Sequence, residues 1–215
     1  KELKDRKEKY GDFEIYGEDY RQQHLWIVDV PAEIPTAAKE KPKAVALTSG
    51  KEFNVNSFDW SPDGSQIAFA ATKSPLLADG GTSDIYVVTV ADKAVNKIVA
   101  TAGPDSGPVW SPDGKWIAFG TANGEPYFFY KNGRIGVVAA GGGPIQIVAK
   151  EFDEDLSPDE WGEDGIYFSA LKGPEVGIYT VAPGGGVKQL FAATGLSFMG
   201  GSFDQVRVDV TSARV

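Results

Sequence analysis

Short apolar runs that follow a turn recur along the chain at a fixed spacing. Ile-Ala-Phe at 67–69 follows Ser-Pro-Asp-Gly at 61–64, and the same two sequences return at 117–119 and 111–114. The tryptophan before each turn is Trp60 in one copy and Trp110 in the next, and a weaker copy is centred on Trp161. Self-similarity with a period of this size predicts a repeat architecture, in which each unit is one supersecondary block that cannot bury its apolar face alone.

Each repeat contains four candidate strands. The Ser-Pro-Asp-Gly turn joins the strand with the tryptophan to the Ile-Ala-Phe strand, because proline presets φ, aspartate accepts bonds from nearby amides and glycine takes a positive φ. Third strands are predicted at 84–90, 134–140 and 177–182, and fourth strands at 97–100, 145–148 and 187–191. Four antiparallel strands with this period predict a β-propeller blade, and helical patterning is almost absent.

The predicted fold is therefore all-β, a β-propeller of four-stranded antiparallel blades. Residues 1–22 form a charged lead-in and blade start, and residues 23–215 form a partial propeller. Three complete blades are expected between two partial ones, with bounds of about 23–50, 55–102, 106–149, 158–193 and 198–215. Since propellers close with about 4–8 blades, we expect open sheet edges, and with them a longer parent polypeptide or self-association through those edges.

Composition narrows the classes of partner. The net charge of −9 and a pI near 4.7 argue against binding to nucleic acid or to an anionic membrane surface, although excess acid can also serve only solubility. No stretch approaches the ~18 apolar residues of a membrane span. The absence of cysteine excludes disulfides and thiolate chemistry but leaves the compartment open.

The sequence also excludes the common catalytic sites. The only histidine, His24, precedes nearly every serine, so a Ser…Asp…His order cannot be built. Residues 195–199 miss the Gly-x-Ser-x-Gly elbow at the last position, and no phosphate-binding glycine motif occurs. One histidine without cysteine does not make an ordinary zinc site. We therefore expect no cofactor, no metal and no covalent chemistry in this chain alone.

An acidic run lies between the second and third complete blades. Its carboxylates belong to Glu151, Asp153, Glu154 and Asp155. The alternation of Asp153 and Asp155 imitates the start of a calcium loop, but proline stands at the sixth position, where the sharp turn needs glycine. Capture of a substrate's amine is a second reading. A solvated inter-blade loop is the third, and the one that we favour.

Aromatic residues give the other candidates. Tyr127, Phe128, Phe129 and Tyr130 are consecutive, and on a strand of period two they cannot all point inward, so they are candidates for ligand or partner contact. The recurring tryptophans Trp60, Trp110 and Trp161 are instead expected to pack in the core or between blades, because burying such rings dominates the energetics of a β core.

The blade signature Trp-Ser-Pro-Asp-Gly-x-x-Ile-Ala-Phe resembles the WD-like propellers of the Tol-system periplasmic protein and of the prolyl oligopeptidase family of serine peptidases. The tracts at 9–13, 18–30 and 46–50 resemble the propeller of bacterial dipeptidyl-aminopeptidase and acylaminoacyl-peptidase members of that family, and the tract at 208–214 resembles a later blade of the same group. In these proteins a propeller caps an α/β-hydrolase domain that carries the Ser-Asp-His triad. The paired-glutamate motif that holds the substrate amine in some dipeptidyl peptidases is not clearly matched here.

The resemblance implies two functions of different classes. The first is a non-catalytic propeller that gates and selects peptide substrates for an α/β-hydrolase domain of the same parent protein, in the bacterial cytoplasm or periplasm. The second is a stand-alone WD-like propeller that acts as a protein-binding platform. A Gly-x-Ser-x-Gly motif encoded downstream of Val215, followed by Asp and His, would distinguish the first from the second.

Overall fold

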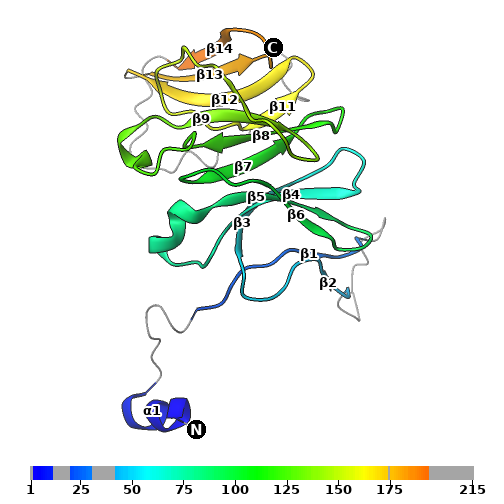
Figure 1. Ribbon diagram of the computed structural model, residues 1–215, viewed down its shortest axis with the longest axis vertical. Coiled ribbons are helices and arrows are strands. Elements are labelled where there is room, and N and C mark those ends of the chain that lie inside the picture. Colours follow the sequence, from blue (N-terminus) through cyan, green and yellow to red (C-terminus); the bar gives the residue numbers. More distant parts are fainter. Residues whose placement is uncertain (1, 12–19, 31–41, 174, 194–215) are drawn as a thin grey trace.

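The computed structural model describes residues 2–11, 20–30, 42–173 and 175–193. Within them, three four-stranded antiparallel sheets and one two-stranded sheet are stacked in chain order (Figure 1). The two-stranded sheet pairs β1 (Trp26–Ile27) with β2 (Val45–Ala46). The last predicted partial blade, 198–215, lies outside the described residues.

Each four-stranded sheet is a meander whose strands neighbour one another in sequence order. The first consists of β3 (Asn54–Trp60), β4 (Gln66–Thr72), β5 (Asp84–Thr89) and β6 (Val95–Val99). The second consists of β7 (Asp105–Trp110), β8 (Trp116–Thr121), β9 (Arg134–Ala139) and β10 (Gln146–Val148). The third consists of β11 (Glu160–Gly162), β12 (Gly165–Lys172), β13 (Glu175–Val181) and β14 (Val187–Ala193). This is the blade architecture that the repeats predict.

The three tryptophans occupy one repeat position. Trp60 pairs with Ile67, Trp110 with Ile117 and Trp161 with Ile166, in each case across the hairpin of the first two strands. The three blades are therefore equivalent in the pairing of their first two strands as well as in sequence.

The Ser-Pro-Asp-Gly turns have the same hydrogen bonds in both copies. In the first, the Ser61 hydroxyl donates to the Asp63 carboxylate at 2.7 Å, and the Ser65 amide donates to it at 3.0 Å. The second copy repeats both bonds, at 2.7 and 3.1 Å. Gly64 and Gly114 have φ of 71° and 69°, the left-handed region that glycine enters without steric cost. The chemistry inferred for this turn is confirmed.

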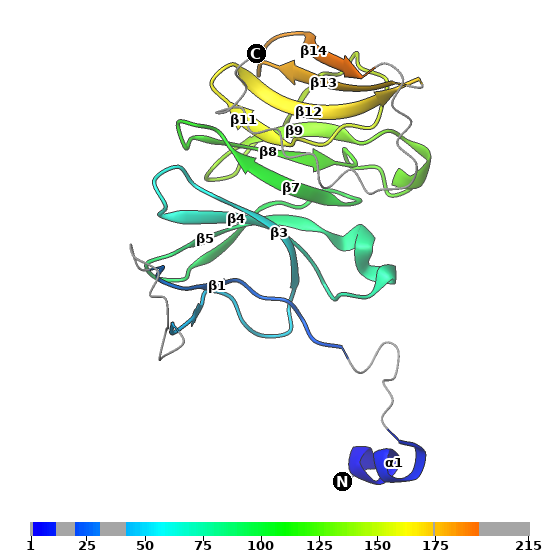
Figure 2. The same ribbon diagram turned by 180° about the vertical axis from the view of Figure 1, so that it is seen from behind.

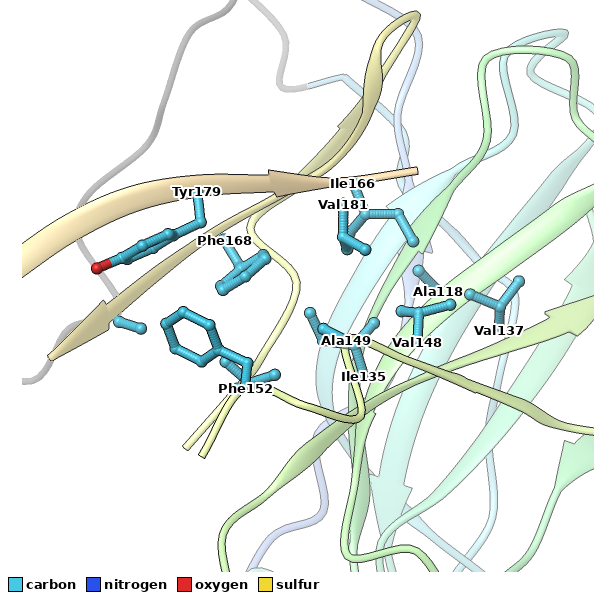
Figure 3. Close-up of a cluster of buried hydrophobic side chains, with 12 residues drawn as sticks. Ala118, Ile135, Val137, Val148, Ala149, Phe152, Ile166, Phe168, Tyr179 and Val181 are labelled. Atoms are coloured by element: carbon cyan, nitrogen blue, oxygen red, sulfur yellow. The ribbon is translucent and has the colours of Figure 1, made fainter. Parts of the chain in front are cut away.

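The core lies between the sheets. Figure 3 shows the cluster between the second and third sheets, where Phe152 from the connecting segment packs against Phe168 and Tyr179. Ile135 and Ile166, from the two facing sheets, are fully buried in the same cluster. Burial of a large apolar side chain contributes about 1.5–3 kcal/mol, so these interfaces hold one blade on the next.

A backbone hydrogen bond also joins each sheet to the preceding one at an equivalent position. In each pair the donor lies near the start of the first strand of a blade. The acceptor lies shortly before the third strand of the preceding blade or, in the first pair, shortly before β1. The three pairs are Val55 N to Gln23 O at 3.0 Å, Asp105 N to Ser83 O at 2.8 Å, and Leu156 N to Gly133 O at 3.2 Å. The blades are therefore joined by the same bond from sheet to sheet.

One sequence expectation about the tryptophans needs correction. Trp110 is 5% exposed, and its indole Nε1 donates to the Asp59 carbonyl of the preceding blade at 3.2 Å, as blade-to-blade packing requires. Trp60, expected to be buried in the same way, is 43% exposed.

Part of the N-terminal segment is helical. The segment expected to be a charged lead-in contains a helix, α1 (Glu2–Tyr10), which lies apart from the stacked sheets (Figure 2). Lys4 with Glu8, and Asp5 with Lys9, have the i, i+4 spacing that brings opposite charges together on a helix surface. No helix in the described part of the chain is long and apolar enough to cross a membrane.

Candidate functional site

The acidic run lies beside the loop that carries the aromatic residues. The loop between β8 and β9, which carries the aromatics, returns to the sheet at Asn132 and Gly133, and both of these residues contact the acidic run. The Asn132 Nδ2 donates to Asp153 Oδ1 at 3.2 Å, and the Gly133 amide donates to Asp155 Oδ1 at 2.6 Å. Two segments about 20 residues apart thus form one loop surface.

These contacts change the reading of the acidic run. Arg134 Nη1 donates to the carbonyls of Phe152 and Glu154, at 3.1 and 3.3 Å, so a positive charge sits against the run. Asp155 is engaged with a backbone amide, while Glu151 is exposed. The run is therefore a hydrogen-bonded loop with part of its charge offset. Among the described residues no group of three or more His, Cys, Asp or Glu could hold a metal ion.

The aromatic residues form a turn that projects from the blade. Phe128–Tyr130 is a 3₁₀ turn, η2, in the segment between β8 and β9. Tyr127, Phe129 and Tyr130 are 76%, 84% and 88% exposed. The Phe128 ring lies against Gly81 in the equivalent 3₁₀ turn of the first blade, η1 (Leu77–Thr82), where an added Cβ would be 3.3 Å from the ring. One ring anchors the turn, and three remain available for contact.

A cavity that the sequence pattern did not predict runs along the inner strands. It measures about 1400 Å³ and is lined by β3, β7 and the segment that enters β11. Asp59 spans two blades at this wall, because its Oδ2 accepts from the Trp110 amide at 2.8 Å and its Oδ1 accepts from the Trp60 amide at 3.0 Å. Only the Asp-Trp dipeptide at 59–60 could have signalled this bridge. The wall is the inner surface of the propeller.

The cavity wall also holds a carboxylate in an apolar setting. Burial raises the pKa of Asp159, against the opposing effect of hydrogen bonds from Ser169. The Asp159 Oδ2 is buried and has no hydrogen-bond partner in the described part of the chain. The ionised carboxylate is therefore incompletely stabilised by its protein surroundings.

A second buried carboxylate, Asp105, has a structural role. It is fully buried and accepts from the Thr101 amide at 3.0 Å, the Thr101 hydroxyl at 3.1 Å and the Thr121 hydroxyl at 2.5 Å. Burial raises its pKa, and the hydrogen bonds oppose that effect. The Asp105 carboxylate therefore links the segment between β6 and β7, through Thr101, to β8, through Thr121.

The histidine is also used structurally. His24 Nδ1 lies 3.2 Å from the Thr48 hydroxyl, and Nε2 lies 3.1 Å from the Gly50 carbonyl. Both ring nitrogens therefore hold the β1–β2 region together, as expected for a satisfied histidine. The near-match to a nucleophile elbow at 195–199 lies outside the described residues.

Stacked four-stranded blades around an inner cavity define the chain as a β-propeller domain. No protein-family model matches the sequence. Dipeptidyl-peptidase 5 of Porphyromonas gingivalis is 31% identical over 181 residues, which cover 75% of this chain and 26% of that protein. The chain is a propeller domain of the prolyl oligopeptidase family, as its blade signature predicts. It spans about a quarter of the length of this relative.

Solved structures share the fold. A TolB protein of Agrobacterium tumefaciens aligns with a TM-score of 0.54 and 20% identity, over 70% of this chain and 52% of that one. Oligogalacturonate lyase of Vibrio parahaemolyticus aligns with a TM-score of 0.55 and 14% identity, over 70% of this chain and 45% of that one. At these identities the comparison shows a common fold only, and the shared feature is the all-β blade.

Proposed function

We propose that this chain is the non-catalytic propeller portion of a serine peptidase, where it gates and selects peptides for an α/β-hydrolase domain of the same parent protein. The observation that carries the proposal is the 31% identity with a dipeptidyl peptidase across most of the chain. The inner cavity of about 1400 Å³ supports it, since a channel through a propeller can admit an extended peptide and exclude a folded protein.

The loop surface supplies the contacts in this proposal. The exposed rings of Tyr127, Phe129 and Tyr130 offer apolar area to a peptide or to the neighbouring domain. In this proposal Glu151 and Glu154 attract a peptide's amine over a longer range, because the carboxylates of Asp153 and Asp155 accept hydrogen bonds from Asn132 and from the Gly133 amide. The cluster thus divides into two carboxylates that build the loop and two that can face a ligand.

The first test uses the gene that encodes this chain. A downstream Gly-x-Ser-x-Gly followed by Asp and His is expected, and the full-length product should cleave dipeptidyl or aminoacyl chromogenic substrates. This 215-residue chain alone should cleave neither and should not react with a serine-directed phosphonate probe. A gene that ends after further blades, with a product that retains a partner protein and lacks peptidase activity, would favour the binding-platform alternative.

The second test concerns selection. In the full-length enzyme, Glu151→Gln with Glu154→Gln should raise KM about two- to fivefold for peptides with a free amino terminus, and less for acylated peptides. Glu163→Gln is the matched control, because Glu163 is exposed and lies at the opposite end of the blade, in the turn between β11 and β12. Equal effects on both peptide classes would leave the acidic run as a solvated loop.

A further inference from the structure

The inner wall of the propeller combines two features that bear on the kind of peptide it would accept. Strands β3, β7 and β11 each present their inner edge to one cavity of about 1400 Å³. The equivalent positions of the three blades therefore face a shared space, and side chains from all three can act on one ligand.

The first feature is charge of one sign. The ionisable residues among the described lining are acids, Asp59, Asp155, Asp159 and Glu160, and that lining contains no lysine, arginine or histidine. Asp155 accepts a hydrogen bond from the Gly133 amide, and this bond does not neutralise its negative charge. Low-dielectric walls concentrate the field of such groups within a cavity, so the negative potential there exceeds that of the same carboxylates on an open surface.

The second feature is aromatic surface beside those carboxylates. Phe58 is 57% exposed and Trp60 is 43% exposed, and both line the cavity. Large rings left open on a cavity wall provide apolar area and, through their faces, attraction for cations. Rings next to carboxylates fit a side chain with an apolar stem and a cationic head.

Asp159 gives an independent indication of a missing partner. Its Oδ2 is buried without a hydrogen-bond donor in the described part of the chain, although most buried polar atoms of folded proteins have one. A cationic group that entered the cavity beside this carboxylate would stabilise its ionised form.

We propose that the inner cavity is a charge filter, which favours extended peptides with lysine or arginine side chains and disfavours peptides with glutamate or aspartate, at positions away from the bond that is cleaved. The role of this filter in selecting substrates rests on the proposed function. Binding of a peptide to the cavity wall can be measured without any cleavage. The residues that carry it are Asp159 and Glu160, with Phe58 and Trp60 as the apolar surface.

The test compares two peptides in the full-length parent protein. They share an amino-terminal dipeptide and differ only in a distal segment, which contains either two lysines or two glutamates. Wild-type protein should bind the lysine peptide about tenfold or more tightly than the glutamate peptide at low salt, measured by anisotropy of a fluorescent label. In Asp159→Asn with Glu160→Gln, that preference should fall about three- to fivefold, while Glu163→Gln, outside the cavity, should keep it.

The outcomes separate the two proposals. A preference that Asp159→Asn with Glu160→Gln leaves unchanged would overturn the charge filter, whether or not the protein is a peptidase. A preference that falls as expected in a protein without peptidase activity would support the filter and overturn the proposed function. If the double variant does not fold, Trp60→Ala should still weaken the lysine peptide more than the glutamate peptide, and equal weakening would count against the proposal.

Discussion

Replacing Asp105 separates the effect of a buried charge from that of the hydrogen bonds it accepts. The carboxylate receives one backbone amide and two hydroxyls, and it is fully buried where β7 begins. In the first blade the residue in register with Asp105 is Val55, and the polar side chain lies one residue earlier, at Asn54, whose Oδ1 accepts from the Gln23 amide at 2.8 Å. Where β3 begins, a neutral amide oxygen therefore serves as the acceptor for a backbone amide.

The two substitutions should consequently differ in cost. Asp105→Ala leaves the Thr101 amide without its acceptor, which destabilises by about 1–3 kcal/mol. With a urea slope of about 2 kcal/mol per molar, the midpoint of unfolding should fall by about 0.5–1.5 M. Asp105→Asn keeps an acceptor for that amide and removes the charge, so its cost should stay within about 1 kcal/mol. Urea unfolding followed by tryptophan fluorescence measures both variants against the unchanged chain.

The pH dependence gives a second measure of the same group. Burial raises the pKa of Asp105 above its ordinary value of 3.8, so the folded state holds the proton to higher pH than the unfolded state does. The contribution of this group to stability is therefore largest below pH 3.8 and falls as the pH rises through the folded pKa. Relative to Asp105→Asn, the unchanged chain should lose stability over that window. If Asp105→Asn costs as much as Asp105→Ala, or if the trend has the opposite sign, the account of this carboxylate is wrong.

Three further predictions concern the repeats. Hydrogen bonds from its turn lower the pKa of Asp63 to about 2, so NMR titration should find its midpoint there, and the stability it provides should be lost as the pH falls from 3.8 towards that value. Gly136→Ala should destabilise by about 1–3 kcal/mol, because the new Cβ would lie 2.6 Å from Phe119 Cζ; a cost below about 0.5 kcal/mol in thermal unfolding would contradict this. Trp110→Phe should cost about 1–2 kcal/mol through the lost indole bond, and Trp60→Phe markedly less; equal costs would show that exposure does not separate the two rings.

The repeats made most of the fold predictable, because the information is local. A Ser-Pro-Asp-Gly turn forms from four adjacent residues, and the strands that it joins carry the alternation that reports burial. The equivalence of Trp60 and Trp110 followed from sequence, but their different exposure did not. Whether a ring is covered depends on the neighbouring blade, and the sequence around the ring says nothing about that neighbour.

The site was less predictable for the same reason. The acidic run looked like an uncompensated cluster because Arg134 and Gly133 lie about 20 residues earlier in the chain. Asp105 stands in a stretch that reads as a polar turn, although its side chain is fully buried. The inner cavity is assembled from three blades at once, and no single stretch of sequence contains it.

The bond that repeats between successive sheets has a consequence for the order in which the molecule opens. The sheets β3–β6 and β7–β10 each have a buried cluster on both faces, and a repeated bond joins each of them to both of its neighbouring sheets. If each interface with a neighbouring sheet adds to the stability of a blade, the blades with a neighbour on both faces should be the most protected against amide exchange. Amide protons of the central strands β4, β5, β8 and β9 should then be the last to exchange with deuterated solvent, and those of β1 and β2 among the first. Amide exchange lifetimes would then decrease from the centre of the stack towards its ends. The cavity wall could therefore stay rigid at its centre while its margins open transiently.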